Sequence, residues 1–287
     1  MKKAICCFTL IVLFAAVSTL SAQETRVIWH GHATVEVKTP KGKILLIDPW
    51  LKNPAKLTYT DENEDPLASV PKIDYILITH AHFDHLDNAV ELGKKTGAKL
   101  ITNFELGKTM EKLLGYPSRQ LSFETLMNIG GEITVADGEV MVAMTQAVHS
   151  CGLSNPFAKD DDRAAPFVYA GNPAGFVLKI KDGPVIYHAG DTAYFTDMKT
   201  IGETYAPDLA IVPIGGHFTM TAPMAARAAA AVKARWALPI HFKTFPVLAQ
   251  THEPFDKALV PYGIISKAIP PNGQLVFKGD NLIRTID

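Results

Sequence analysis

The chain has 287 residues, of which 47% are hydrophobic and 20% are charged. This apolar content excludes an intrinsically disordered protein, which requires low hydrophobicity and high net charge. The 28 Lys and Arg residues nearly balance the 29 Asp and Glu residues, giving a formal net charge of −1. No nucleic-acid partner is therefore expected.

The first 22 residues have the pattern of a bacterial-type secretory signal peptide. Residues 1–3 are basic at Lys2 and Lys3, residues 4–17 carry no charge, and residues 18–22 are small or apolar ahead of Gln23. We expect cleavage after Ala22 and a periplasmic or secreted protein comprising residues 23–287. The alternative is an uncleaved membrane anchor, because residues 4–22 approach the roughly 20 residues of a spanning helix.

Cleavage would remove two of the three cysteines, Cys6 and Cys7, and leave Cys151 alone. No intrachain disulfide is then possible, although an exported protein could carry one. Stability must come mainly from the core.

Strands are predicted by short apolar runs that are rich in β-branched residues and bounded by Gly, Pro or Asp. In chain order they cover residues 26–29, 34–38, 43–47, 75–79, 99–101, 132–135, 140–148, 175–180, 185–188, 209–212, 237–240 and 274–277.

Helices are predicted at residues 87–96, 104–114, 196–204, 223–235 and 254–265. In the fourth, Thr221 lies near the N-cap and Pro223 near the first helical position, where each residue type is favoured. No linker divides the chain, so we expect a single α/β domain over residues 23–287.

Two long loops are expected, at residues 52–72 and 151–173. Each contains three prolines and an acidic run. Loops of this length in a compact domain are often functional rims or lids.

The most informative segment follows the predicted strand 75–79 and reads Thr79-His80-Ala81-His82-Phe83-Asp84-His85. In an extended segment, residues i and i+2 project to the same side, so His80 and His82 can bind one ion together. The following turn directs Asp84 and His85 toward a second point. Imidazole and carboxylate groups suit Zn²⁺, with Mn²⁺ or Fe²⁺ as alternatives.

The pattern His80-x-His82-x-Asp84-His85 resembles the signature motif of the metallo-β-lactamase superfamily. Three further positions match the family in the expected order. His149 follows the strand 140–148, Asp191 lies in a Gly-Asp-Thr segment, and His241 lies in Pro-Ile-His-Phe. The resemblance covers essentially all of residues 23–287.

This resemblance implies a first metal held by His80, His82 and His149. It implies a second metal held by Asp84, His85 and His241, with Asp191 bridging the two. The implied fold is a four-layer αββα sandwich, in which helices cover two β-sheets and the metals lie at one edge.

Four further segments resemble a subfamily of small metal-dependent hydrolases related to ascorbate-6-phosphate lactonases and N-acyl-phosphatidylethanolamine phospholipase D. They are residues 29–34, 48–50, 190–193 and 213–220. Most members of the subfamily lack a secretory leader. The leader in this sequence therefore argues against a cytosolic phosphosugar substrate. Lys243 also stands where the pattern has Asn.

Two adjacent divalent cations would lower the pKa of a shared water, which could then attack a carbonyl or phosphorus as hydroxide. Asp84 and Asp191 would be the catalytic carboxylates that hold the proton. The predicted function is hydrolysis of a small ester, lactone or phosphodiester.

Substrate contacts or residues supporting the ligands are expected among His32, His217, Lys243 and Tyr194. His188 is expected in the core, His30 beside His32, and His252 in a loop. Cys151 follows His149 closely, but no base is assigned to it and no nucleophilic role is expected.

The same sequence disfavours several other functions. A serine hydrolase lacks its Gly-x-Ser-x-Gly elbow, and dinucleotide binding lacks Gly-x-Gly-x-x-Gly. A nuclease of the same superfamily is disfavoured because no basic cluster is present. The remaining alternatives are a class B type β-lactamase, which export suits, and a non-catalytic periplasmic metal-binding protein on the same fold.

Overall fold

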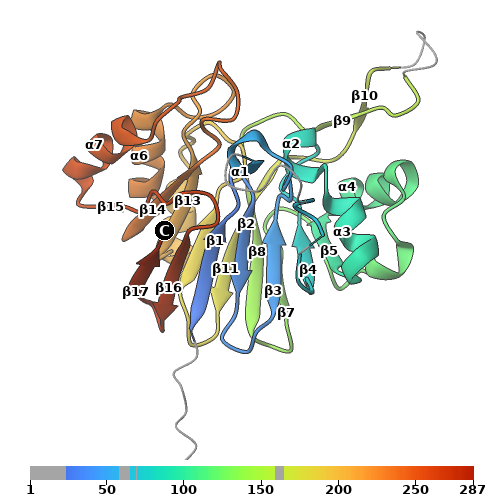
Figure 1. Cartoon of the computed structure of the whole chain (residues 1–287), viewed down its shortest axis with the longest axis horizontal. Coiled ribbons are helices and arrows are strands. Elements are labelled where there is room, and N and C mark those ends of the chain that lie inside the picture. The colour runs from blue at the N-terminus through green and yellow to red at the C-terminus, as the bar shows by residue number, and fades with distance from the viewer. Residues whose placement is uncertain (1–23, 58–64, 69, 159–164) are drawn as a thin grey trace, which may run out of the picture.

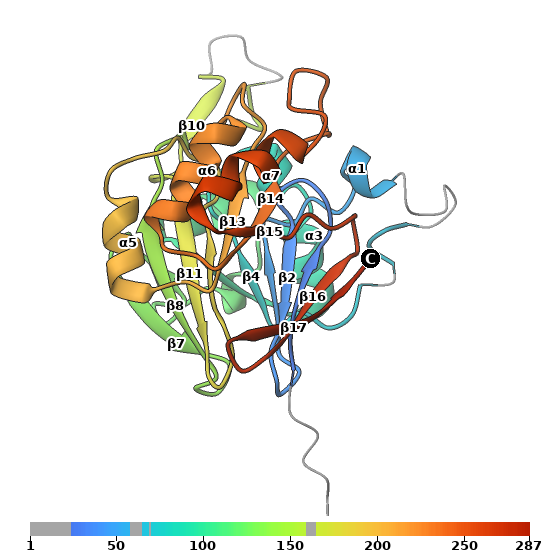
Figure 2. The same cartoon turned by 90° about the vertical axis from the view of Figure 1, so that its left-hand side faces the viewer.

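Two β-sheets face one another, and helices cover the outer side of each (Figures 1 and 2). The structure is a computed structural model that describes residues 24–57, 65–68, 70–158 and 165–287. The predicted signal peptide and parts of both predicted loops lie outside these residues. None of the helices in the described ranges is long and apolar enough to cross a membrane.

The first sheet has eight strands in the order β17-β16-β1-β2-β3-β4-β5-β6. Its strands are β17 (Asn281–Ile286), β16 (Gln274–Lys278), β1 (Thr25–Trp29), β2 (Val35–Lys38), β3 (Ile44–Ile47), β4 (Tyr75–Leu77), β5 (Lys99–Asn103) and β6 (Leu126–Met127). Strands β3 to β6 are mutually parallel, and the other neighbours are antiparallel.

The second sheet has seven strands in the order β15-β14-β13-β12-β11-β8-β7. Its strands are β15 (Ile265–Ser266), β14 (Trp236–Ile240), β13 (Leu209–Pro213), β12 (Val185–His188), β11 (Ala174–Ile180), β8 (Val140–Gln146) and β7 (Glu132–Val135). Strands β12 to β15 are parallel. A separate ribbon pairs β9 (Gly152–Ser154) with β10 (Phe167–Tyr169).

The helices fall into two groups on opposite sides of the sandwich (Figures 1 and 2). The first sheet carries α2 (Phe83–Leu86), α3 (Ala89–Thr96) and α4 (Phe104–Thr109), while α1 (Pro54–Leu57) is a single turn. The second sheet carries α5 (Met198–Tyr205), α6 (Ala222–Ala231) and α7 (Glu253–Leu259). This arrangement confirms the predicted αββα sandwich.

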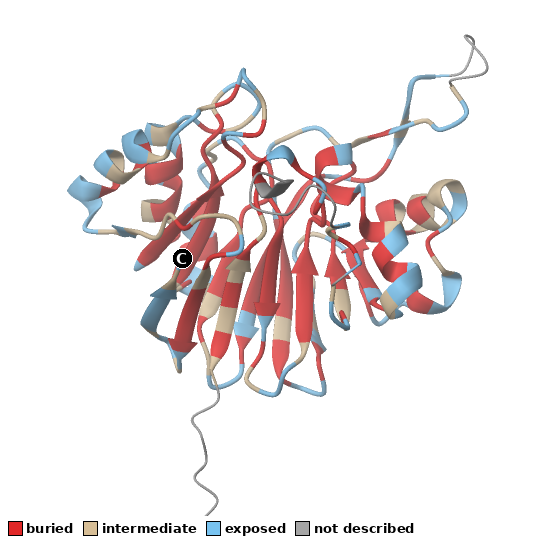
Figure 3. Cartoon of the chain, in the orientation of Figure 1, coloured by how far each residue is buried: buried red, intermediate tan, exposed pale blue. Residues whose placement is uncertain are grey.

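The period-2 alternation of strand side chains explains how one sheet contributes to two cores. On β3, Leu45 and Ile47 belong to the large core that the two sheets share. Ile44 and Leu46, which alternate with them, belong to a second core beneath α3 and α4. These strands are therefore buried on both faces, as Figure 3 shows for the centre of the molecule.

Every predicted strand is present, with ends that differ by at most two residues. The predictions missed α1, α2 and strands β6, β9, β10, β15 and β17, which are short or largely exposed. Thr221 is the N-cap of α6, as predicted.

Two helix ends, the type of one helix and one loop were predicted wrongly. The helix predicted at 104–114 changes to a π-helical turn at Met110–Leu114, and the one predicted at 254–265 passes through a 3₁₀ turn at Val260–Tyr262 into β15. The helix predicted at 223–235 ends at Ala231, because Lys233 adopts a positive φ of 61°. The loop predicted at 151–173 contains the β9–β10 ribbon instead.

Candidate metal centre

The predicted ligands all follow strands that end at the same edge of the sandwich. His80 comes shortly after β4, His149 after β8, Asp191 after β12, and His241 directly after β14. Because neighbouring parallel strands present their carboxyl ends at one edge, residues far apart in sequence meet there. Asp84 and His85 reach the same point from the short helix α2.

One group of side chains consists of His80, His82 and His149. Each offers a ring nitrogen, and these nitrogens lie within 4.8 Å of one another. His80 Nε2 is 2.9 Å from His82 Nδ1, so the i and i+2 positions face a common point as the sequence predicted. The Ser150 hydroxyl lies 3.3 Å from the other ring nitrogen of His82.

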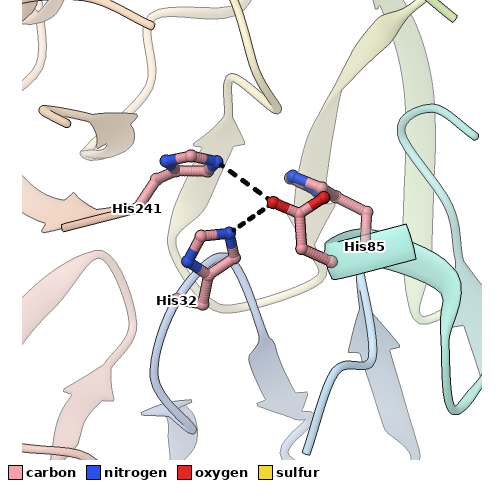
Figure 4. A group of neighbouring side chains, drawn as sticks. His32, His85 and His241 are labelled. Carbon is pink, nitrogen blue, oxygen red and sulfur yellow. Dashed lines mark hydrogen bonds and ion pairs between the residues drawn. The ribbon is translucent and has the colours of Figure 1, made fainter. Parts of the chain in front are cut away.

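A second group consists of Asp84, His85 and His241, with His32 beside them. In Figure 4 the rings of His32 and His241 point toward the same carboxylate oxygen. His32 Nε2 lies 3.0 Å and His241 Nε2 lies 3.7 Å from Asp84 Oδ2. His32 was predicted to support the ligands, and it contacts one of them directly.

Asp191 lies between the two groups. Its Oδ2 is 3.0 Å from His241 Nε2 and 3.4 Å from His85 Nε2 in the second group. The same oxygen is 3.7 Å from His149 Nε2 and 4.0 Å from His80 Nε2 in the first group. Asp191 therefore lies near histidines of both groups.

Several polar atoms at this centre are buried without a hydrogen-bond partner. They are Asp191 Oδ1, His85 Nε2 and both ring nitrogens of His241. Unsatisfied buried polar atoms are costly, so a cluster of them at one point calls for a ligand. Imidazole and carboxylate donors at this spacing fit bound divalent cations.

The histidines of the first group favour the neutral form. Burial lowers the pKa of His80 well below its ordinary value and lowers the pKa values of His82 and His149. A neutral imidazole has the free lone pair that a metal requires.

In the second group, charged neighbours decide the direction of the pKa shifts. Burial would lower the pKa of His241, but Asp191 and Asp84 outweigh it and raise the pKa to about 9. Burial would also lower the pKa of His85, yet Asp191 and Asp48 raise it well above its ordinary value. Burial opposes ionisation of Asp84 and Asp191, but the adjacent histidines hold both pKa values below the ordinary range.

Asp48 is a residue of this site to which the sequence analysis gave no role. It is fully buried, and its Oδ2 accepts hydrogen bonds from His85 Nδ1 over 2.8 Å and from Thr79 Oγ1 over 2.7 Å. The Thr79 backbone N–H binds its other oxygen. The one sequence feature that could have indicated this role is its position just after a predicted strand, in Asp48-Pro49-Trp50.

Left-handed backbone conformations gather at the centre. His32, Asp48 and His241 have φ values of 50°, 46° and 57°, which are uncommon for residues other than glycine. Such conformations persist where the surrounding structure enforces them, and they concentrate at functional sites. The His241 backbone N–H donates to the His32 carbonyl over 3.0 Å, which fixes these two residues together.

Three other predicted site residues lie outside the two groups. His217 is exposed, and its ring contacts Phe218. Tyr194 is half-buried beneath the guanidinium of Arg227, which lies 4.7 Å from its ring centroid. Lys243 is exposed and lines a separate cavity of about 500 Å³ with Trp29 and Phe242.

The remaining predicted residues have structural partners. His188 is fully buried and bonds the Ala33 carbonyl, His30 pairs with Glu36, and His252 pairs with Asp256 at the start of α7. Burial raises the pKa of the Cys151 thiol to about 11, which fits a residue without a nucleophilic role.

Comparisons with known proteins agree with this geometry. The family described as "Beta-lactamase superfamily domain" matches residues 43–242. A UPF0173 metal-dependent hydrolase from Thermodesulfovibrio yellowstonii is 44% identical over 269 residues, covering 94% of this chain and 96% of the relative. Another, from Anaeromyxobacter sp. strain K, is 47% identical over 238 residues, covering 82% and 81%.

Solved structures show the same fold. Igni18, a metallo hydrolase from Ignicoccus hospitalis, superposes with a TM-score of 0.73 at 31% identity, covering 88% of this chain and 98% of that one. The metallo-β-lactamase fold protein YhfI from Bacillus subtilis gives 0.63 at 14% identity, covering 88% and 99%. At that identity the likeness concerns the fold alone.

Proposed function

Because this chain belongs to the metallo-β-lactamase superfamily and is a metal-dependent hydrolase, we propose that it is an exported two-metal enzyme acting on a small ester, lactone or phosphodiester. The first metal site would comprise His80, His82 and His149. The second would comprise Asp84, His85 and His241. Zinc suits these donors best, and manganese or iron are alternatives.

The position of Asp191 carries the proposal for two ions. One oxygen of this carboxylate lies between 3.0 and 4.0 Å from the Nε2 atoms of four histidines, two from each group. The unpartnered buried nitrogens, on His85 and His241, lie in the second group, while the three neutral histidines of the first group offer a separate set of donors. Two ions would give both groups a role, and the carboxylates of Asp84 and Asp191 would offset part of their positive charge.

Two bound cations would supply an activated water at neutral pH and would polarise the scissile group. The surrounding side chains would accept a proton and orient the ligands. Asp84 keeps a carboxylate that can accept a proton, and the hydrogen bond from His32 Nε2 to its Oδ2 fixes its orientation. His32 is itself held by Thr244, whose Oγ1 lies 2.7 Å from its Nδ1.

Asp48 and Thr79 complete the support of the ligands. The Asp48 carboxylate fixes the ring of His85 so that its Nε2 faces Asp191. Thr79 links Asp48 to His80. Its Oγ1 donates a hydrogen bond to Asp48 and lies 3.0 Å from His80 Nδ1. Outer partners of this kind orient metal-binding imidazoles and raise their basicity.

Export is proposed from the amino-terminal sequence alone. A basic start, an uncharged stretch and small residues before Gln23 are the elements of a secretory leader. Mass measurement of protein recovered from the periplasm or medium tests this, since cleavage after Ala22 predicts a chain beginning at Gln23. Recovery of only the full-length chain in the cytosol would contradict it.

A substrate panel on metal-reconstituted protein tests the hydrolase assignment. The panel contains ethyl esters, γ-lactones, a phosphodiester and the β-lactam nitrocefin. We expect turnover of at least one of the first three classes, loss of that turnover with EDTA, and its return with Zn²⁺ or Mn²⁺. Turnover confined to nitrocefin would assign a β-lactamase instead, and turnover that survives complete metal removal would contradict the proposal.

A further inference from the structure

The metal centre is bordered by exposed apolar residues. Phe83 lies between His82 and Asp84 in sequence and is 55% exposed. Val148 directly precedes His149 and is 43% exposed. Single exposed hydrophobic side chains are common on protein surfaces, so these two matter because each directly adjoins a predicted metal ligand.

The border continues around Asp191. Ala193 is exposed, and its backbone N–H donates to the Val148 carbonyl over 3.0 Å. The Val148 N–H donates in turn to Thr192 Oγ1 over 3.0 Å. The segments that carry His149 and Asp191 therefore lie side by side, with two apolar side chains at the surface.

Phe83 is the outer member of an aromatic cluster that extends to the metal centre. Its ring centroid lies 5.7 Å from that of Trp50 and 6.4 Å from that of Phe245, and the latter two rings stack at 5.8 Å. Trp50 and Phe245 both contact the ring of His32, at 5.0 and 5.9 Å. Because Trp50 is almost fully buried, the cluster is a rigid support that leaves one face of Phe83 in solvent.

The two carboxylates of the centre have no lysine or arginine partner in the part of the chain that the structure describes. Among the described residues, Asp84 and Asp191 form ion pairs with histidines and with no lysine or arginine. Arg227 is engaged by the ring of Tyr194. An apolar group of a substrate would find Phe83 and Val148 exposed at this border.

We propose that the centre selects substrates whose scissile carbonyl carries an apolar acyl chain, and that Phe83 is the residue that determines this preference. This inference rests on the proposed hydrolase function and narrows it to acyl esters and lactones. The acyl chain of the substrate packs on the exposed part of the Phe83 ring while the scissile carbonyl lies at the metal centre. Burial of a methylene against such a surface raises affinity by about two- to fourfold.

The test compares kcat/KM for ethyl acetate, butyrate, hexanoate and octanoate. For the wild-type protein we expect a rise of about two- to fourfold per added methylene until Phe83 is covered. Phe83→Ala lowers the ratio of hexanoate to acetate by about tenfold, and Phe83→Leu restores part of it. Phe123→Ala is the matched control, because Phe123 is 88% exposed and packs on Phe104 away from the centre.

Metal content is measured for each variant, since Phe83 adjoins two predicted ligands. If Phe83→Ala loses metal, the chain-length series of Phe83→Leu is compared with that of the wild type instead, because leucine keeps an apolar side chain at this position. A flat chain-length series in the metal-loaded wild type overturns the inference and leaves the hydrolase function standing.

Calorimetric titration of metal-loaded protein with acetate, hexanoate and octanoate separates the two proposals. Tighter binding of the longer carboxylates, weakened by Phe83→Ala but not by Phe123→Ala, supports the apolar border even if no ester is hydrolysed. Equal affinity for all three carboxylates in the wild type counts against the inference, whatever the hydrolysis assay gives.

Discussion

The Nδ1–H group of His85 donates a hydrogen bond to Asp48 Oδ2 over 2.8 Å, and neither side chain has any exposed surface. This pair joins two neighbouring strands of the first sheet, because Asp48 follows β3 and His85 lies beyond the end of β4. The bond fixes which ring nitrogen of His85 remains free. That nitrogen, Nε2, faces Asp191.

Asp48→Asn should weaken metal binding while leaving the backbone undisturbed, since Asn tolerates the positive φ of this position. The amide would present a donor where Asp48 now accepts bonds from His85 and Thr79. We expect metal affinity to fall by about 10- to 100-fold, measured by competition with a chelating dye. Asp280→Asn, at an exposed surface carboxylate, is the control. Equal affinities for both variants and the wild type would remove the role of Asp48.

Asp191→Asn should reduce the number of bound metals below two. An amide oxygen carries no net charge to join two cations, and its nitrogen has no lone pair to bind one. Turnover should drop by at least about 100-fold, because a carboxylate that can also hold a proton is lost. Metal content and kcat are measured on the same sample. Full turnover with two metals retained would show that Asp191 does not bridge.

Metal binding should release protons at neutral pH. In the metal-free chain the pKa of His241 is raised to about 9 and that of His85 is raised well above its ordinary value, so both are cationic at pH 7. The lowered pKa values of His80, His82 and His149 make those rings neutral at the same pH.

A metal needs the neutral form of each ring, so binding should displace about two protons per chain from these two rings at pH 7, in addition to any proton lost by a metal-bound water. The release should decline as the pH rises through the pKa of His241, because the ring is then already neutral. Zinc titrations by calorimetry in buffers of different ionisation enthalpy measure this number. A release near zero at pH 7 would place His85 and His241 outside the metal sites.

The packing of α5 on α6 gives a stability prediction independent of the metal centre. A Cβ added at Gly202 would lie 2.6 Å from the Ala231 carbonyl oxygen and 2.7 Å from Val232 Cα, both backbone atoms. Gly202→Ala should therefore lower the free energy of unfolding by about 1–3 kcal/mol, despite the better helix propensity of Ala.

Glu203→Ala, at the exposed neighbouring position, should change the unfolding free energy by no more than about 0.5 kcal/mol. Urea denaturation of both variants gives the comparison. A Gly202→Ala variant as stable as the wild type would mean that the two helices can separate without cost.

Local pattern was enough to predict the first part of the site. His80 to His85 are adjacent in sequence, so strand geometry and a turn already imply that they converge. His149, Asp191 and His241 were assigned from family resemblance, because their convergence depends on both sheets. The structure brings all seven predicted ligands together within these two groups and Asp191.

Residues whose role depends on distant packing were not predictable in the same way. Asp48 carries no local mark of its bond to His85, because that bond requires the parallel pairing of β3 with β4. Lys243 was expected to contact the substrate or to support the ligands. Instead it lines a different cavity, and its backbone has a positive φ of 66°. Strand β17 was missed because most of its residues are exposed and provide little apolar pattern.

A zinc titration of the EDTA-treated protein, with bound metal and hydrolysis followed together, tests the two-metal account most directly. The account predicts two equivalents bound per chain and a steep rise in turnover of the best ethyl ester only as the second equivalent binds. His82→Ala and His241→Ala should each bind one equivalent and remain inactive. Full activity at one equivalent, or two equivalents retained in both variants, would contradict the central claim.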